Sequence, residues 1–152
     1  MVCRRRTFWW QSVAKRPCRK RRNGLDKPAV LDASAILAVL FNEPGSKAIL
    51  PHLQGGLLSA VNLAEVYARL LAGGAPADFA WDRVLHLGCV VSPFDDQQAR
   101  LAGELRGVSR SLGLSFGDRA CLALATQRHA TAYTTNPAWR SLSLGIDVKV
   151  IR

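Results

Sequence analysis

Four oxygen-bearing side chains stand where a strand is expected to end or a helix to begin. Asp32 follows the short apolar run 29–31, and Glu65 and Asp118 fall in the first turns of two expected helices. Asn136 follows a later expected strand. In a mainly parallel sheet the carboxyl ends of the strands share one edge, and ligands bind along that edge. We therefore expect these four side chains to converge into one acidic site.

The chemistry of such a site follows from its charge. Carboxylates that gather in one place repel one another, and a proton or a cation must relieve the repulsion. Hard divalent cations such as Mg²⁺ prefer oxygen ligands and keep several waters in their coordination shell. A bound metal ion lowers the pKa of its water and stabilises charge on a phosphate. The four residues therefore predict a metal site suited to phosphodiester hydrolysis.

Each of the four side chains also has a simpler structural interpretation. Asp118 stands three residues after Ser115, so it could complete a capping box and favour the helix dipole. Glu65 could be an ordinary exposed residue, and Asn136, which precedes a proline, could form a turn. The structural interpretation is weakest for Asp32, because this residue ends a strand expected to be buried and no helix cap is needed so early. The four positions taken together favour the site.

The remaining sequence supplies the elements that would position these residues. Apolar runs alternate with turn signals along the chain. Strands are expected over 29–32, 57–59, 89–91, 130–134 and 146–151, and helices over 33–42, 45–54, 60–72, 77–87, 95–112 and 117–129, with a short helical turn over 136–142. Strands that alternate with helices predict an α/β fold with a mainly parallel central sheet flanked by helices.

The basic character of the chain belongs to its N-terminal segment. The net charge is +10 over 152 residues, yet nearly half of the 21 Lys and Arg residues lie in residues 1–27. This segment has no apolar periodicity, and we expect it to be disordered. Two interpretations stay open. It is either an arm that binds nucleic acid through cations and aromatic rings, or a non-native extension from an upstream start codon. The folded domain is expected over 28–152.

Other features restrict the class of protein. No apolar run approaches the roughly 20 residues that a membrane span needs, and no signal peptide is recognisable. Cys89 and Cys121 are interpreted as buried thiols of a cytosolic protein rather than as a disulfide. Trp81 and Trp139 are interpreted as packing residues rather than base-stacking platforms. We therefore expect a cytoplasmic protein without a membrane partner.

The motifs resemble those of the PIN-domain ribonucleases and, among them, the VapC-type toxins of toxin–antitoxin pairs. The resemblance spans residues 28–152 and is carried by Leu31-Asp32-Ala33-Ser34-Ala35, by residues 59–66, by Leu114-Ser115-Phe116-Gly117-Asp118 and by residues 134–139. It implies a PIN-like three-layer sandwich. It also implies an endoribonuclease that depends on Mg²⁺ or Mn²⁺, is usually a homodimer and is inhibited by a cognate antitoxin protein.

The resemblance assigns a role to each matching position. It implies that Asp32, Glu65 and Asp118 are acidic metal ligands that take part in catalysis on RNA. The hydroxyl groups of Ser34 and Thr134 would support that site.

The fourth position departs from the family's usual pattern, which has an acid where this chain has Asn136. Asparagine keeps one oxygen but loses the charge, so weaker metal binding is expected. This difference and the basic segment favour a second hypothesis, an inactive PIN-like domain that binds RNA or a partner without cutting. A third, a phosphohydrolase of small phosphoesters, is disfavoured because Asp32-Ala33-Ser34 lacks a second acid two residues on.

Overall fold

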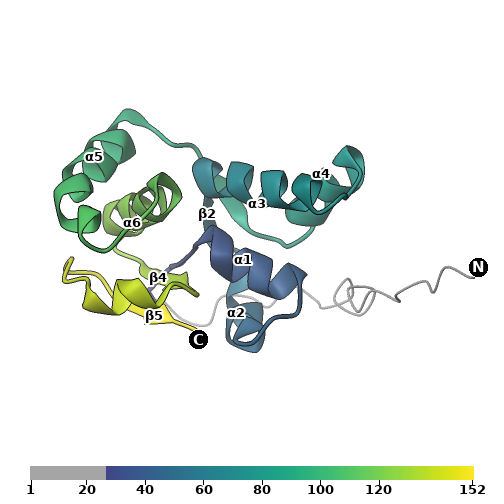
Figure 1. Ribbon diagram of the computed structural model, residues 1–152, viewed down its shortest axis with the longest axis horizontal. Coiled ribbons are helices and arrows are strands. Elements are labelled where there is room, and N and C mark those ends of the chain that lie inside the picture. Colours follow the sequence, from purple (N-terminus) through teal and green to yellow (C-terminus); the bar gives the residue numbers. More distant parts are fainter. Residues whose placement is uncertain (1–26) are drawn as a thin grey trace, which may run out of the picture.

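The computed structural model describes residues 27–152, so the expectation for the N-terminal basic segment falls outside the described residues. Five parallel strands form one sheet in the order β3-β2-β1-β4-β5. Figure 1 shows the sheet among its helices, with β2, β4 and β5 labelled. The strands are β1 (Ala29–Leu31), β2 (Leu57–Ser59), β3 (Val90–Ser92), β4 (Thr131–Thr134) and β5 (Val148–Val150). The helices are α1 (Ala33–Leu40), α2 (Ser46–Leu53), α3 (Ala60–Ala72), α4 (Ala77–Leu85), α5 (Asp96–Arg110), α6 (Phe116–Arg128) and the 3₁₀ helix η2 (Pro137–Ser141).

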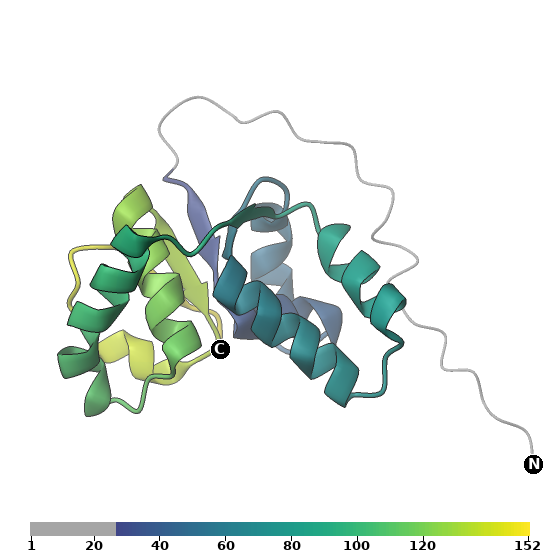
Figure 2. The ribbon, with the colours of Figure 1, turned by 90° about the horizontal axis from the view of Figure 1, so that it is seen from above.

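Helices cover both faces of the sheet. Figure 2 shows α5 and α6 on one side of the strands and α1 to α4 on the other. Neighbouring strand residues divide between the two cores: Leu31 packs with Ile36 and Ile49 of α1 and α2, whereas Val30 packs with Leu122 of α6. This follows from the two-residue period of a strand, which needs apolar side chains on both faces when both are covered. The predicted α/β fold with three layers is confirmed.

The strand order places a reversal of direction at β1. The chain runs outward from β1 to β2 and β3, then returns through α5 and α6 to place β4 and β5 on the other side of β1. In open parallel sheets, ligands bind at the carboxyl edge where such a reversal occurs. Asp32 directly follows β1 and therefore stands at this position.

Most expected elements are present, with boundaries shifted by a few residues. The predicted caps at Ser59 and Ser115 are confirmed, and Asp95 caps α5. The strand predicted over 29–32 ends at Leu31, because Asp32 is the N-cap of α1. The expectation that no cap is needed at Asp32 is therefore wrong.

The two cysteines within the described residues are free thiols. Cys121 is fully buried as predicted, whereas Cys89 lies just before β3 and is only partly buried. Among the helices of residues 27–152, none has the length and apolar character that a membrane crossing requires.

Substitution of Gly45 tests how the C-terminal segment packs on the turn before α2. Its φ is +87°, and a Cβ atom there would overlap with the carbonyl of Ile151. Gly74 has a similar φ of +85° with open space around it. Both alanine variants carry the left-handed backbone penalty, but only Gly45→Ala adds an overlap, which typically costs about 1–3 kcal/mol. Urea unfolding should therefore show Gly45→Ala to be less stable than Gly74→Ala. Equal losses would contradict this packing.

Candidate metal-binding site

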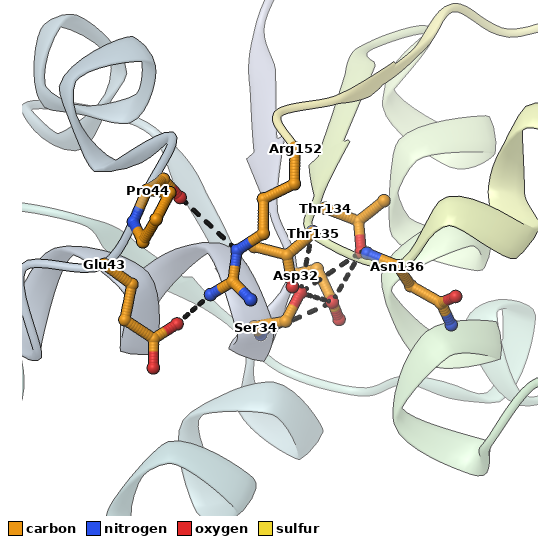
Figure 3. A network of polar contacts seen from close by, with 8 residues as sticks. All are labelled: Asp32, Ser34, Glu43, Pro44, Thr134, Thr135, Asn136 and Arg152. Atoms are coloured by element: carbon orange, nitrogen blue, oxygen red, sulfur yellow. Dashed lines mark hydrogen bonds and ion pairs between the residues drawn. The ribbon is translucent and has the colours of Figure 1, made fainter.

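Asp32 is a buried carboxylate surrounded by neutral hydrogen-bond donors. The residue is 4% exposed. Its Oδ2 atom accepts hydrogen bonds from Ser34 Oγ at 2.5 Å and Thr134 Oγ1 at 2.9 Å (Figure 3). Its Oδ1 atom accepts a hydrogen bond from Asn62 Nδ2 at 3.2 Å. Its Oδ2 atom also accepts a hydrogen bond from the Ser34 backbone N–H at 3.4 Å, and through this bond Asp32 caps α1. These donors fix the carboxylate without supplying a positive charge.

The two hydroxyl groups are themselves oriented by backbone donors that follow β4. Ser34 Oγ accepts a hydrogen bond from the Thr135 N–H at 3.0 Å, and Thr134 Oγ1 accepts one from the Asn136 N–H at 3.1 Å (Figure 3). Each hydroxyl proton is then directed at Asp32. The two hydroxyl oxygens also lie 3.2 Å apart, within hydrogen-bond distance of each other. The network joins the ends of β1 and β4 and brings the hydroxyl groups of Ser34 and Thr134 to the Asp32 carboxylate.

Glu65 and Asp118 approach each other at the N-terminus of α6. Glu65 lies in α3, and its Oε2 atom reaches the backbone of Gly117, where a Cβ atom would overlap with it. Asp118 follows Gly117 and completes the predicted capping box: its Oδ2 atom accepts a hydrogen bond from the Ser115 N–H at 2.7 Å. The structural interpretation of Asp118 is therefore correct, since its carboxylate completes the cap of α6.

The three carboxylates influence one another electrostatically. The pKa of Asp32 is raised from 3.8 to about 6. Burial is the largest cause of this rise, the charges of Asp118 and Glu65 contribute to it, and the hydrogen bonds from Ser34 and Thr134 oppose it. Burial also raises the pKa of Glu65, with a further contribution from Asp118 and an opposing one from Arg69. Three of the four side chains expected at the site, Asp32, Glu65 and Asp118, thus lie close enough to influence one another's charge.

Asn62 is a buried residue of this region that the sequence reasoning missed. It lies one helical turn before Glu65 in α3 and is fully buried. Its Nδ2 atom donates to both Asp32 Oδ1 and the Gly117 carbonyl, each at 3.2 Å. Its Oδ1 atom has no hydrogen-bond partner. The only signal in the sequence was a polar residue on the buried face of an apolar helix.

Asn136 joins the region through its backbone rather than its side chain. Its N–H contacts Thr134, but its Oδ1 atom accepts a hydrogen bond from the Ala138 N–H at 3.1 Å and caps η2. Figure 3 shows the side chain directed away from Asp32. The side-chain oxygen of Asn136 therefore caps η2, and the predicted turn before Pro137 is present.

The two tryptophans within residues 27–152, Trp81 and Trp139, differ in burial. Trp139 is 0% exposed, as its interpretation as a packing residue requires. Trp81 is 44% exposed on α4 and lies edge-on against Tyr67, so it is not a core residue. A second contact of Trp139 was not expected: its Nε1 atom donates to Asp118 Oδ1 at 3.2 Å.

The donor set fits a hard, hydrated cation rather than a closed metal centre. Within residues 27–152, no group of three His, Cys, Asp or Glu side chains is arranged to hold a metal ion by itself. Mg²⁺ usually takes one or two protein carboxylates and completes its shell with water. A buried carboxylate without a cationic partner and a buried amide oxygen without a donor are consistent with such an ion.

Comparison with known proteins places this architecture in a family. The PIN-domain family model matches residues 29–143. The chain belongs to the PIN-domain family. Curated proteins gave no match to the sequence.

Three solved structures show the same fold as this PIN domain at low sequence identity. One is a toxin–antitoxin complex from Klebsiella pneumoniae, with 14% identity and a TM-score of 0.63 over 82% of this chain and 98% of that one. DNA-bound VapBC from Salmonella typhimurium has 18% identity and a TM-score of 0.58 over 81% and 97%. FitAcB from Neisseria gonorrhoeae has 24% identity and a TM-score of 0.52 over 79% and 95%.

The raised pKa of Asp32 predicts a specific pH dependence of stability for the metal-free protein. The folded state binds this proton more tightly than the unfolded chain, so the stabilisation is complete below pH 3.8 and is lost as the pH rises through about 6. This loss amounts to about 3 kcal/mol. In chelator, Asp32→Asn should therefore gain stability relative to wild type between pH 4 and pH 7 in urea unfolding. If the unfolding free energies of the two proteins changed in parallel with pH, the raised pKa of a buried Asp32 carboxylate would be contradicted.

Gly117→Ala should displace Glu65 without unfolding the protein. The added methyl group would overlap with the flexible end of Glu65, and the backbone at this position accepts alanine because its φ is not positive. We expect roughly tenfold weaker Mn²⁺ binding and little change in the urea midpoint. Gly107→Ala in α5, where the added methyl meets nothing within 4 Å, is the matched control. Wild-type Mn²⁺ affinity in Gly117→Ala would place Glu65 outside the metal site.

Proposed function

We propose that this PIN domain is a metal-dependent endoribonuclease and the toxin of a toxin–antitoxin pair. The observation that carries the proposal is the burial of Asp32 beside two further carboxylates at the carboxyl edge of the sheet. A folded protein rarely keeps a buried charge without a partner. Electrostatic strain of this kind is typical of functional sites.

In this proposal Asp32, Glu65 and Asp118 hold Mg²⁺ or Mn²⁺, some directly and the others through water. The bound ion would activate a water and stabilise charge on the scissile phosphate of RNA. Ser34, Thr134 and Asn62 orient Asp32 through the hydrogen bonds described above. Because the pKa of Asp32 is about 6, the carboxylate is mostly ionised at neutral pH and able to bind a cation.

The proposed partners are RNA, a cognate antitoxin and a second copy of the chain, in the cytoplasm. The names of the similar structures include toxin–antitoxin complexes, which supports an antitoxin partner here. Exposed apolar side chains also gather on α4, where Phe79, Trp81 and Leu85 are each more than 40% exposed. Such a surface is suited to a protein partner.

An inactive RNA- or partner-binding domain is the second candidate. The observation that favours it is the side-chain oxygen of Asn136, which caps η2 and is directed away from Asp32 (Figure 3).

Cleavage of a mixed, structured RNA pool tests the proposed function. Wild-type protein should cut in Mg²⁺ or Mn²⁺ and not in chelator, and Asp32→Asn and Asp118→Asn should lose at least about a hundredfold in rate, since each removes charge that holds the ion. Gly107→Ala should cut normally.

If RNA is retained in a binding assay but never cut, the inactive binding module is correct. Normal cutting by Asp32→Asn would refute the site. Hydrolysis of a small phosphomonoester would point to the phosphohydrolase.

Asn136→Asp should lower the Mg²⁺ concentration needed for half-maximal cleavage. Asp caps helices as well as Asn does, so η2 should be preserved while a negative charge is added beside the site. A Mg²⁺ titration of the cleavage rate measures the effect. An unchanged titration would show that position 136 does not influence the ion.

A further inference from the structure

We propose that Trp139 is a positioning residue whose indole N–H holds the carboxylate of Asp118 in the orientation that the cation requires. This inference rests on the proposed metal site. It gives a role to Trp139, which is interpreted from the sequence only as a packing residue, and assigns Asn136 an indirect role in the same site.

The contact between Trp139 and Asp118 follows from the complete burial of the Trp139 side chain. Trp139 is the largest fully buried side chain in residues 27–152, and it packs in the core with Leu122 and Cys121 of α6. A buried indole N–H needs an acceptor, because leaving it unpaired is unfavourable. Asp118 Oδ1 is that acceptor, at 3.2 Å. The largely apolar ring of Trp139 is therefore buried with one polar group, its Nε1–H, which donates to Asp118.

Helix capping alone does not explain this contact. The capping box uses the other oxygen, Oδ2, which accepts the hydrogen bond from the Ser115 N–H. With Trp139 on Oδ1 and Ser115 on Oδ2, each oxygen of Asp118 has one fixed donor. A carboxylate oxygen can accept more than one hydrogen bond, so each keeps acceptor capacity for a cation or its waters. Two donors on opposite oxygens fix the plane of the carboxylate, which one donor would leave free to rotate.

The position of Trp139 depends on the turn that carries it. Pro137 begins η2 and Asn136 caps it through the hydrogen bond to the Ala138 N–H. The Asn136 N–H in turn contacts Thr134 Oγ1, which donates to Asp32. This short turn therefore links Thr134, which donates to Asp32, with Trp139, which donates to Asp118. Asn136 acts on Asp118 through the placement of Trp139.

The test replaces the indole with a ring that lacks the donor. Trp139→Phe in the full chain keeps an aromatic ring in the core but removes the N–H. Trp81→Phe makes the same chemical change at an exposed site on α4 and is the matched control. Mn²⁺ binding to each protein is measured by titration calorimetry, and folding is checked by urea unfolding. Removing the partner of a metal-ligating group typically weakens binding by about 10- to 100-fold.

We expect Trp139→Phe to bind Mn²⁺ roughly tenfold more weakly, whereas Trp81→Phe binds like wild type. Wild-type affinity in a folded Trp139→Phe protein would overturn the positioning role and leave the proposed function intact. If wild-type protein binds no Mn²⁺, the metal site itself is wrong and this inference falls with it.

A second measurement on wild-type protein keeps the test decisive if Trp139→Phe does not fold. In ¹⁵N-labelled wild-type protein, the indole N–H signal of Trp139 should exchange slowly with solvent and shift on addition of Mg²⁺, while that of Trp81 should do neither. A Trp139 indole signal that Mg²⁺ leaves unchanged would contradict the contact's role.

Discussion

Burial of the Asp32 carboxylate at the end of β1 constrains the rest of the site. Removing a charge from water is strongly unfavourable unless hydrogen bonds and an opposite charge replace the lost hydration. Ser34, Thr134 and Asn62 supply the hydrogen bonds but are neutral. The repulsion from Asp118 and Glu65 adds to the imbalance. A divalent cation at this place would remove both unfavourable contributions at once, which is the physical basis of the proposed metal site.

The fold brings the supporting groups to Asp32 from parts of the chain that are distant in sequence. Asn62 lies 30 residues away and also ties the backbone at Gly117, 55 residues further on. Thr134 lies 102 residues away in β4. The parallel pairing of β1 with β4 and with β2 sets these positions, since all three strands end at the same edge. The sheet order thus determines which side chains can meet.

The local features of this protein were readable from the sequence. Apolar runs gave the strands and helices, and short-range chemistry gave the caps at Ser59 and Ser115, because a cap involves residues only two or three apart. The four oxygen-bearing positions were found because a parallel sheet collects strand ends at one edge. The assignment of Asp32, Glu65 and Asp118 to one region rested on that rule and on the family resemblance.

The features that were missed depend on long-range packing. Nothing near Asn62 indicates that its amide would bridge Asp32 and Gly117, and nothing near Trp139 indicates that its indole would reach Asp118. The exposed position of Trp81 was not predicted, because an aromatic residue in an amphipathic helix is interpreted as a packing residue when the positions of its neighbours are unknown. The side-chain direction of Asn136 was likewise undetermined, because asparagine before proline can either cap a turn or face a site.

Paramagnetic broadening by Mn²⁺ in the ¹⁵N spectrum of the protein tests the central claim most directly, because it locates the ion without requiring activity. The account predicts that substoichiometric Mn²⁺ first broadens the amide signals that follow β1 and β4 and those at the start of α6, around Asp32, Thr135 and Asp118. Broadening that begins instead at the exposed acids of α4, Asp78 and Asp82, would contradict a metal site at the carboxyl edge of the sheet.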